Sequence, residues 1–301
     1  MNIHLDNVDL KSLSGPNSFA QKLIKYASKS DCTFDVDKPA NIHLCFIETH
    51  RQFFNAPMFQ RLDGIYFNTR SDYNIQNANI RRTYEMADGV IFQSYFNKEL
   101  ITKYFGPHEN WRIIHNGADT ELIEKTEPME HPILDKFENT WMCASNWRPH
   151  KRLNENVRYF LEYSGDNDCL VIAGDGISEK FSKHSRVFAV GAVDRETLIS
   201  LYKRSKYFLH LAWLDHCPNV VVDARASGCQ IVCSDSGGTK EIAGPDAILI
   251  REKIWNLEPL DLYSPPKLDF TKNLGNVCAQ SYDMMGCTSK YKSFFTRITL
   301  E

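Results

Sequence analysis

Two aspartates, Asp215 and Asp223, lie eight positions apart around the start of a predicted helix in the second half of the chain. Pro218 suits the first turn of this helix, where a missing N–H group costs nothing. The free backbone N–H groups of a helix start can hold a phosphate. Because Asp215 precedes the helix and Asp223 lies inside it, the two carboxylates can face one cleft at different depths. The spacing predicts a site for a phosphate-bearing ligand.

The residues after Asp223 favour a close approach of the backbone to this site. Small side chains let the end of the helix pack close to the next predicted strand, 230–233; they are Ala224, Ala226, Ser227 and Gly228. Gly237 and Gly238 follow that strand, and a glycine turn lets the backbone come near a ligand. Glu241 ends the segment.

The segment 215–241 resembles the donor-binding signature of the group 1 glycosyltransferases, a retaining family (family four) with the two-domain GT-B fold. The family pattern runs from an acid through a second acid and a short strand to Gly-Gly-x-x-Glu. The family normally has glutamate at both acidic positions, whereas this chain has Asp215 and Asp223. The shorter side chain needs a closer backbone or a bridging water to make the same contact.

This resemblance implies a role for each residue of the segment. Asp215 corresponds to the catalytic-site acid that contacts the sugar or orients the site, and Asp223 to the acid that binds the ribose of the nucleotide. The other donor-binding residues that it implies are Cys217, Pro218, Asn219, Val220, Gly237, Gly238 and Glu241. The alternative interpretation is that both aspartates are solvated acids near a helix N-terminus, where negative charge is stabilising.

A basic loop, 145–152, follows the first predicted strand of the second half and resembles the family's Arg…Lys pair, which holds the donor diphosphate. The resemblance implies catalytic roles for Arg148 and Lys151 and a donor contact for Asn146. A guanidinium and an ammonium can neutralise the charge that builds on a departing nucleoside diphosphate. Arg152 stays open as an alternative to Lys151, because the family spacing varies here.

Glycine-containing turns complete the implied donor site. Gly174 follows a predicted strand, and Gly191 and Val193 end the next one, where the family contacts the nucleobase. Gly15 lies in the segment 14–19, which resembles the family's glycine loop beside the donor phosphates. Simple capping of a helix by Ser18 is the alternative for this segment.

The acceptor side of the cleft belongs to the first half of the chain. Many relatives carry a histidine in the region of 61–68, where this chain has Arg61 and Asp63. Asp63 is the catalytic candidate of this half, able to orient the acceptor or to stabilise the transition state. Arg61 and His50 are the acceptor-side candidates.

The elements that position these residues alternate between short apolar runs and helical patterns, which is typical of α/β units with mostly parallel sheets. The predicted strands are 41–47, 64–68, 89–93, 111–115, 140–144, 169–173, 187–190, 207–211 and 230–233. The predicted helices are 18–29, 78–86, 97–105, 153–163, 195–204 and 219–227. We expect two Rossmann-like, doubly wound domains that face each other across a cleft, with ligands beyond the carboxyl ends of the strands.

A charged stretch with two prolines, 123–137, has no clear periodicity and predicts the boundary between the domains. We expect an N-terminal acceptor-side domain at 1–125 and a donor domain for the nucleotide sugar at 126–275. A C-terminal helix is expected within 276–301, over 277–297, and it could pack back on the N-terminal domain.

The composition limits partners and location. A formal net charge of -3 over 301 residues gives no reason to expect nucleic acid as a partner. The nine cysteines form no zinc-spaced cluster, and such a scattered set suits the reducing cytosol. Neither a signal peptide nor a long apolar run is found, so we expect a cytoplasmic protein. Peripheral contact with a membrane surface stays open.

The resemblance implies a retaining hexosyl- or pentosyltransferase with a nucleotide-diphosphate sugar as co-substrate and a glycan or another hydroxyl compound as acceptor. A UDP-sugar is preferred over a GDP-sugar on family frequency alone. The family requires no metal or other cofactor. Two alternatives stay open: a GT-B-type sugar-nucleotide epimerase and a catalytically silent protein that binds nucleotide sugars. A nicotinamide dehydrogenase is disfavoured, because no Gly-x-Gly-x-x-Gly follows the first strand.

Overall fold

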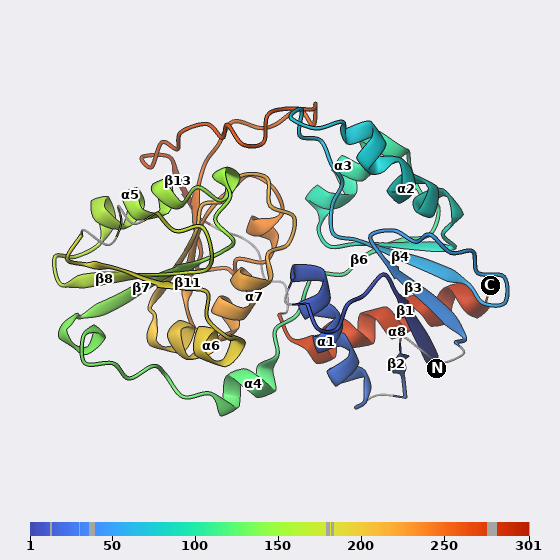
Figure 1. The fold of residues 1–301 in the computed structure, drawn as a ribbon, viewed down its shortest axis with the longest axis horizontal. Helices are drawn as coiled ribbons and strands as arrows, with labels where there is room; N and C mark the ends of the chain where they lie inside the picture. Colours follow the sequence, from blue (N-terminus) through green and yellow to red (C-terminus); the bar gives the residue numbers. More distant parts are fainter. Residues whose placement is uncertain are drawn as a thin grey trace.

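The computed structural model describes residues 1–12, 14–29, 31–35, 40–178, 181, 184–275 and 282–300. Two sheets lie side by side along the longest axis of the molecule, each with helices packed on it (Figure 1). The first sheet takes its strands from residues 2–113 and the second from residues 139–275. The predicted pair of doubly wound α/β sheets is confirmed.

The first sheet has the strand order β2-β1-β3-β4-β5-β6, and all of its neighbouring strands are parallel. The strands are β1 Asn2–Asp6, β2 Thr33–Asp35, β3 Ile42–Phe46, β4 Met58–Leu62, β5 Gly89–Phe92 and β6 Trp111–Ile113. One face is covered by α1 Gly15–Ala27 and α8 Met284–Leu300, and the other by α2 Tyr73–Met86 and α3 Tyr95–Phe105. Cover on both faces explains why most of these strands are apolar throughout.

The second sheet has the order β13-β12-β11-β10-β7-β8-β9 and is parallel except for β13, which runs antiparallel to β12. The strands are β7 Asn139–Ala144, β8 Asp168–Ala173, β9 Val187–Gly191, β10 Tyr207–His210, β11 Gln230–Ser234, β12 Ile248–Ile250 and β13 Asn273–Gly275. One face carries α6 Arg195–Arg204 and α7 Asn219–Ala226, and the other carries α5 Leu153–Tyr163.

The predicted strand at 64–68 is wrong, because the central strand of this region is β4, Met58–Leu62. Gln60 and Arg61 in β4 are fully buried although both are polar. Because two polar residues interrupt the apolar run, the sequence does not show the pattern of a buried strand. Most of the groups that bind these two side chains come from distant segments, so little nearby indicates that they are buried. The strands β1, β2, β12 and β13 lie outside the predicted set as well. The other predicted strands and the six predicted helices are confirmed, with shifts at their ends.

The start of α1 corrects a second expectation. Ser14, not Ser18, takes the N-cap position, and Pro16 lies in the first turn, where a missing N–H is no loss. Gly15 is therefore the first residue of the helix. By contrast, α3 begins as a capping serine dictates, because the Ser94 hydroxyl accepts the N–H of Asn97.

Residues 251–272, which we call the crossing segment, leave β12 of the second sheet, reach the side of the first sheet and return to β13 (Figure 1). Arg70, which precedes α2, donates to both carboxylate oxygens of Asp261 at 2.7 and 2.9 Å. The ring of Trp255 packs against Phe67 with centroids 4.7 Å apart. The two halves are thus joined by more than the chain connection near 123–137.

The C-terminal helix α8 crosses back to the first sheet, where Tyr291, Phe294 and Phe295 are buried together with residues of α1. The predicted helix began at residue 277, and 277–281 lie outside the described residues. Between the sheets the chain forms α4 Thr120–Lys125 and a short turn of 3-10 helix, Leu134–Lys136. The domain boundaries at 125 and 275 stay a prediction.

Candidate active site

The carboxyl edges of the two sheets face each other, and contacts between side chains of one and backbone of the other join them. The Asn116 amide, after β6, donates to the carbonyl of Cys217 at 2.9 Å. The Asn219 amide at the start of α7 donates to the carbonyl of Gly15 at 3.0 Å, so the N-termini of α1 and α7 meet (Figure 1). Ligands of open α/β sheets bind beyond the carboxyl ends of the strands, and this edge is therefore the candidate site.

Asp215 lies at the centre of the site, held by two basic side chains. Its Oδ2 is 2.5 Å from Lys151 Nζ and 2.9 Å from His210 Nε2. Burial alone would raise the pKa of Asp215, but Lys151 and His210 together hold it well below the usual range. Asp215 is consequently a carboxylate at neutral pH, and its charge is already matched by Lys151.

The backbone around Asp215 is shaped by two glycines of the turn after β11. Gly237 has a φ of 75°, and a Cβ there would lie 2.5 Å from the carbonyl oxygen of Asp215. Gly238 donates its N–H to the same carbonyl at 2.8 Å, and a Cβ on it would collide with the carbonyl of His216. Only glycine fits at these two positions, as the sequence predicted for a turn that approaches the site closely.

His216 lies between the two sheets, where its ring fills the space beside Gly64. Its Nδ1 is 3.0 Å from Nδ2 of Asn97 in α3. Burial lowers the pKa of His216 to about 4, so the ring is neutral at pH 7. This residue acts as packing between the halves and carries no charge into the cleft.

In the loop after β7, Lys151 and Arg152, the two candidates for the second cation of the Arg…Lys pair, point to different partners. The guanidinium of Arg152 is buried and donates to both carboxylate oxygens of Glu252, each at 2.7 Å. Lys151 instead points to Asp215 at the carboxyl edge. Arg148 and Asn146 are exposed, and Arg148 makes no ion pair among the described residues. Of the two alternatives, Lys151 is the one that reaches the site.

The residues predicted to border the nucleobase lie where β8 and β9 end. The N–H of Gly174 donates to the carbonyl of Gly191 at 2.7 Å. A Cβ on Gly174 would collide with the carbonyl oxygen of Ser145, which brings this turn against the basic loop. Val193, two residues beyond Gly191, is partly buried.

Asp223 is paired across the interface with Lys22, a residue that the sequence analysis did not single out. Lys22 lies in α1, and its Nζ is 3.4 Å from Oδ1 of Asp223. Nζ also donates to the carbonyl of Gly117 at 2.7 Å. The side chain of Asp223 is 14% exposed and that of Lys22 only 1%.

Glu241 points toward the first sheet. Its two carboxylate oxygens accept the backbone N–H groups of Tyr95 and Phe96, at 2.8 and 2.9 Å, at the start of α3. Oε2 also lies 2.9 Å from Nε2 of His115. A carboxylate at a helix N-terminus is stabilising there. Glu241 therefore clamps the two halves together from the edge of the site.

Arg61 and Asp63 form a partly buried ion pair on the first-sheet side. Arg61 is wholly buried, and its guanidinium also donates to Oδ1 of Asn116 at 2.8 Å and lies 4.1 Å from the ring centroid of Phe19. Burial raises the pKa of Asp63, although Arg61 opposes the shift. His50 is exposed, apart from this group.

Four residues that the sequence analysis did not single out belong to the site or to its frame. They are Lys22, Asn97, His210 and His216. His210 is the last residue of β10, five residues before Asp215. Its position at the carboxyl end of a strand could have identified it as a candidate site residue. The other three meet partners more than 100 residues away, for which the sequence holds no spacing signal.

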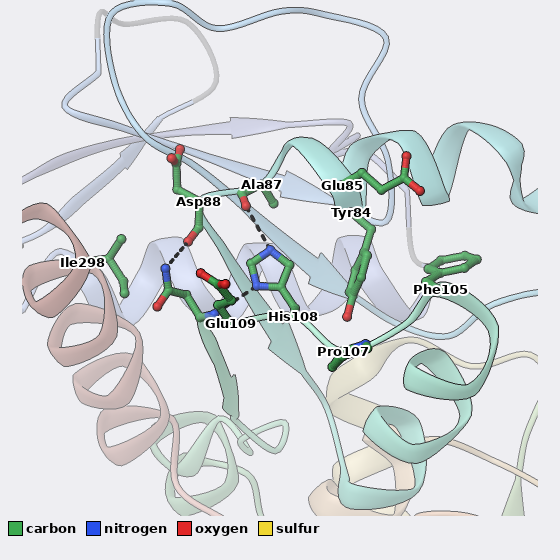
Figure 2. Close-up of a pocket in the computed structure, with 10 residues that line it drawn as sticks. Tyr84, Glu85, Ala87, Asp88, Phe105, Pro107, His108, Glu109 and Ile298 are labelled. Carbon is green, nitrogen blue, oxygen red and sulfur yellow. Dashed lines mark hydrogen bonds between the residues drawn. The ribbon is translucent and has the colours of Figure 1, made fainter.

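A surface hollow elsewhere lies at the opposite edge of the first sheet (Figure 2). It is lined by the residues that precede β5 and β6, among them Asp88 and His108, together with Ile298 of α8. Nε2 of His108 lies 2.9 Å from the carbonyl of Ala87. The hollow borders the amino ends of the strands and is separate from the candidate site.

Residues 130–255 match the model of the family described as glycosyl transferases group 1. This range holds the basic loop, Asp215, Asp223 and the glycine turn. No curated protein matches the sequence.

Several solved structures share the fold over most or nearly all of the chain. Sucrose-phosphate synthase from Thermosynechococcus elongatus has a TM-score of 0.65 at 14% identity, covering 84% of this chain and 86% of that one. HepE from Anabaena, in complex with UDP and glucose, has a TM-score of 0.68 at 14% identity, covering 99% and 100%. WaaG, a glycosyltransferase involved in lipopolysaccharide biosynthesis, has a TM-score of 0.61 at 9% identity, covering 99% and 94%.

The chain therefore has the GT-B fold, and its residues 130–255 are similar to the group 1 glycosyltransferases. The predicted resemblance to the group 1 glycosyltransferases, the predicted fold and the assignment as a glycosyltransferase are confirmed, whereas family four and a retaining reaction stay predictions. Within the described ranges, no helix is long and apolar enough to cross a membrane.

Proposed function

We propose that the chain is a retaining glycosyltransferase that moves a hexosyl or pentosyl group from a UDP-sugar, in preference to a GDP-sugar, to a hydroxyl group of a glycan or another acceptor. The observation that carries this proposal is the basic loop at the carboxyl edge of the second sheet, where Arg148 is exposed and Lys151 lies 2.5 Å from Asp215. The preference for UDP is supported by HepE, which was solved with UDP and with UDP-glucose.

In this proposal the donor diphosphate binds at Arg148, Lys151 and the facing starts of α1 and α7. Arg148 has no carboxylate partner in the described part of the chain, so its charge is available to a diphosphate. Gly15 and Asn219 begin the two helices, and helix N-termini favour anions. The same segments contain the other predicted donor-binding residues, which are Asn146, Cys217, Pro218 and Val220. The turn of Gly237 and Gly238 fixes the position of Asp215 beside them.

The remaining roles follow from position. Asp223 would bind the ribose, and Gly174, Gly191 and Val193 would border the base. Asp63, with Arg61, would orient the acceptor from the first sheet, and His50 would contribute only at the outer rim, because it is exposed. Glu241 would support the donor site by holding the two halves together.

The proposed reaction proceeds on one face of the sugar. The bond between the anomeric carbon and the diphosphate oxygen breaks as the acceptor oxygen bonds to the same face of that carbon. The proton of the acceptor hydroxyl passes to an oxygen of the leaving diphosphate. Arg148 and Lys151 stabilise the charge that develops there, and the proposal requires no metal or other cofactor.

We also propose the division into an acceptor-side domain at 1–125, a donor domain at 126–275 and a C-terminal segment at 276–301, and we propose the cytoplasm as the compartment. The eight cysteines of the described residues are free and buried, which suits a reducing compartment. Nucleic acid is no proposed partner at a net charge of -3. Peripheral contact with a membrane that carries the acceptor is compatible with the proposal.

The test is a donor screen that measures released nucleoside diphosphate. UDP-sugars and GDP-sugars are incubated with the protein, with and without candidate acceptors, and the anomeric configuration of any product is read by NMR. We expect slow hydrolysis of one UDP-sugar without acceptor and a retained configuration in the product. Epimerised sugar nucleotide without acceptor would support the epimerase alternative instead. Binding of UDP with no turnover of any donor would support a silent binding protein.

A further inference from the structure

Lys22 is a buried cation that reaches from the first-sheet side into the donor side of the interface. It lies in α1, with its side chain 1% exposed. Nζ donates to the carbonyl of Gly117 at 2.7 Å and to Oδ1 of Asp223 at 3.4 Å. Burial lowers the pKa of Lys22, and the adjacent carboxylate opposes that shift. A buried ammonium persists only beside a compensating charge, so Lys22 and Asp223 depend on each other.

The second oxygen of Asp223 is left for a ligand. Lys22 occupies Oδ1, and Oδ2 accepts no hydrogen bond from any described residue. The side chain is 14% exposed, so the carboxylate is not sealed from the cleft. Since Lys22 is anchored on Gly117, the direction of the free oxygen is set before a ligand arrives.

Building on the function proposed above, we propose that Lys22 is a donor-specificity residue that orients Asp223, so that Oδ2 accepts the ribose hydroxyl groups of the nucleoside diphosphate. A carboxylate with one oxygen already fixed loses less side-chain entropy when it binds a hydroxyl. Lys22 itself touches no ligand and is a positioning residue. Its place on α1, which meets α7 at Gly15 and Asn219, makes recognition of the ribose depend on contact between the two halves.

The test compares two nucleotides that differ only in the ribose hydroxyls, UDP and 2′,3′-dideoxy-UDP, by calorimetric titration into the full chain. A hydroxyl bonded to a carboxylate is worth roughly tenfold to a hundredfold in affinity. We expect the wild type to prefer UDP by at least about tenfold. If GDP proves to be the ligand, the guanosine pair replaces the uridine pair.

Two variants and a control separate recognition from folding. Lys22→Met keeps most of the length of the side chain but removes the ammonium that holds Asp223, and Asp223→Asn keeps the shape but removes the charge. Lys25→Met is the matched control, because Lys25 is on the same helix and pairs with Asp119, away from Asp223. Thermal unfolding of each variant checks that it is folded.

We expect Lys22→Met and Asp223→Asn to bind UDP about as weakly as the dideoxy nucleotide, so that the preference disappears, while Lys25→Met keeps it. A Lys22→Met variant that loses affinity for both nucleotides by the same factor would overturn the proposal, since Lys22 would then be merely structural. If Lys22→Met does not fold, an unchanged preference in Asp223→Asn overturns the proposal by itself. A wild type that binds neither UDP nor GDP refutes the proposed function, whereas a wild type that binds UDP without any preference refutes only this inference.

Discussion

Replacing Lys151 with methionine removes the partner of a carboxylate that stays charged inside the protein. Lys151 Nζ lies 2.5 Å from Oδ2 of Asp215, and the two side chains are 20% and 14% exposed. Breaking a buried pair by removing one partner costs about 3–5 kcal/mol. Because both side chains keep some solvent contact and His210 still bonds to Asp215, we expect a loss at the lower end, about 3 kcal/mol in the free energy of unfolding.

The difference in stability between the wild type and Lys151→Met should depend on pH in a definite direction. The pKa of Asp215 in the folded protein lies well below its ordinary value, so the stabilisation is complete above about pH 4 and is lost as the pH falls through the folded pKa. In Lys151→Met the buried carboxyl takes up its proton at a higher pH, which relieves the penalty. The difference between wild type and variant should therefore be largest near pH 7 and shrink in acid.

Urea unfolding followed by circular dichroism at pH 7 and at pH 4 measures this difference. Lys206→Met, at an exposed lysine, is the control. A double-mutant cycle completes the assay, because Lys151→Met should cost little in an Asp215→Asn background. An equal cost in both backgrounds, or a difference that does not change with pH, would refute the assignment of the stability to this pair.

Two further predictions concern the contacts between the halves. Glu241→Ala should lower the free energy of unfolding by about 2–4 kcal/mol, because two N–H groups at the start of α3 lose a charged acceptor. Thermal unfolding and titration with UDP check this prediction. Normal stability with lost affinity for UDP would mean that Glu241 binds the donor and does not hold the two halves together. Burial lowers the pKa of His216 to about 4 in the folded protein. As the pH falls, the unfolded chain binds a proton at this histidine at a higher pH than the folded protein does. The free energy of unfolding should therefore decrease by about 3 kcal/mol between about pH 6.5 and pH 4. His216→Gln should flatten that decline in a pH series of urea unfolding, and exposed His184→Gln should not; equal slopes in both variants would contradict the burial argument.

That the residues expected on the donor side lie together could be predicted, because they are close together in the sequence. Asp215, Pro218 and the Gly237-Gly238 turn belong to one strand–helix–strand unit, in which local turn and helix chemistry fixes the spacing. The basic loop follows the neighbouring strand β7 and meets this unit at the same carboxyl edge. Sheet topology alone therefore brings Arg148, Lys151 and Asp215 to one side.

The interface between the halves could not be predicted, because its partners share no local pattern. An arginine such as Arg61 is ordinarily expected on the surface, but in β4 it is buried and contacts Asp63 and Asn116. The same reason accounts for the missed strand β4. Lys22 and Asp223 are 201 positions apart, and nothing near either residue points to the other. The crossing segment was assigned to the donor half alone, although Asp261 in it pairs with Arg70.

The central claim is that the carboxyl edge of the second sheet binds a nucleoside diphosphate through the basic loop. Titrating UDP and GDP into the wild type and into Arg148→Ala by calorimetry tests it most directly, since Arg148 is exposed and its loss leaves the buried contacts intact. We predict saturable binding of UDP at one site, at least about tenfold weaker in the variant with an unchanged melting temperature. No binding of either nucleotide to the wild type, or equal affinity in Arg148→Ala, would contradict the account.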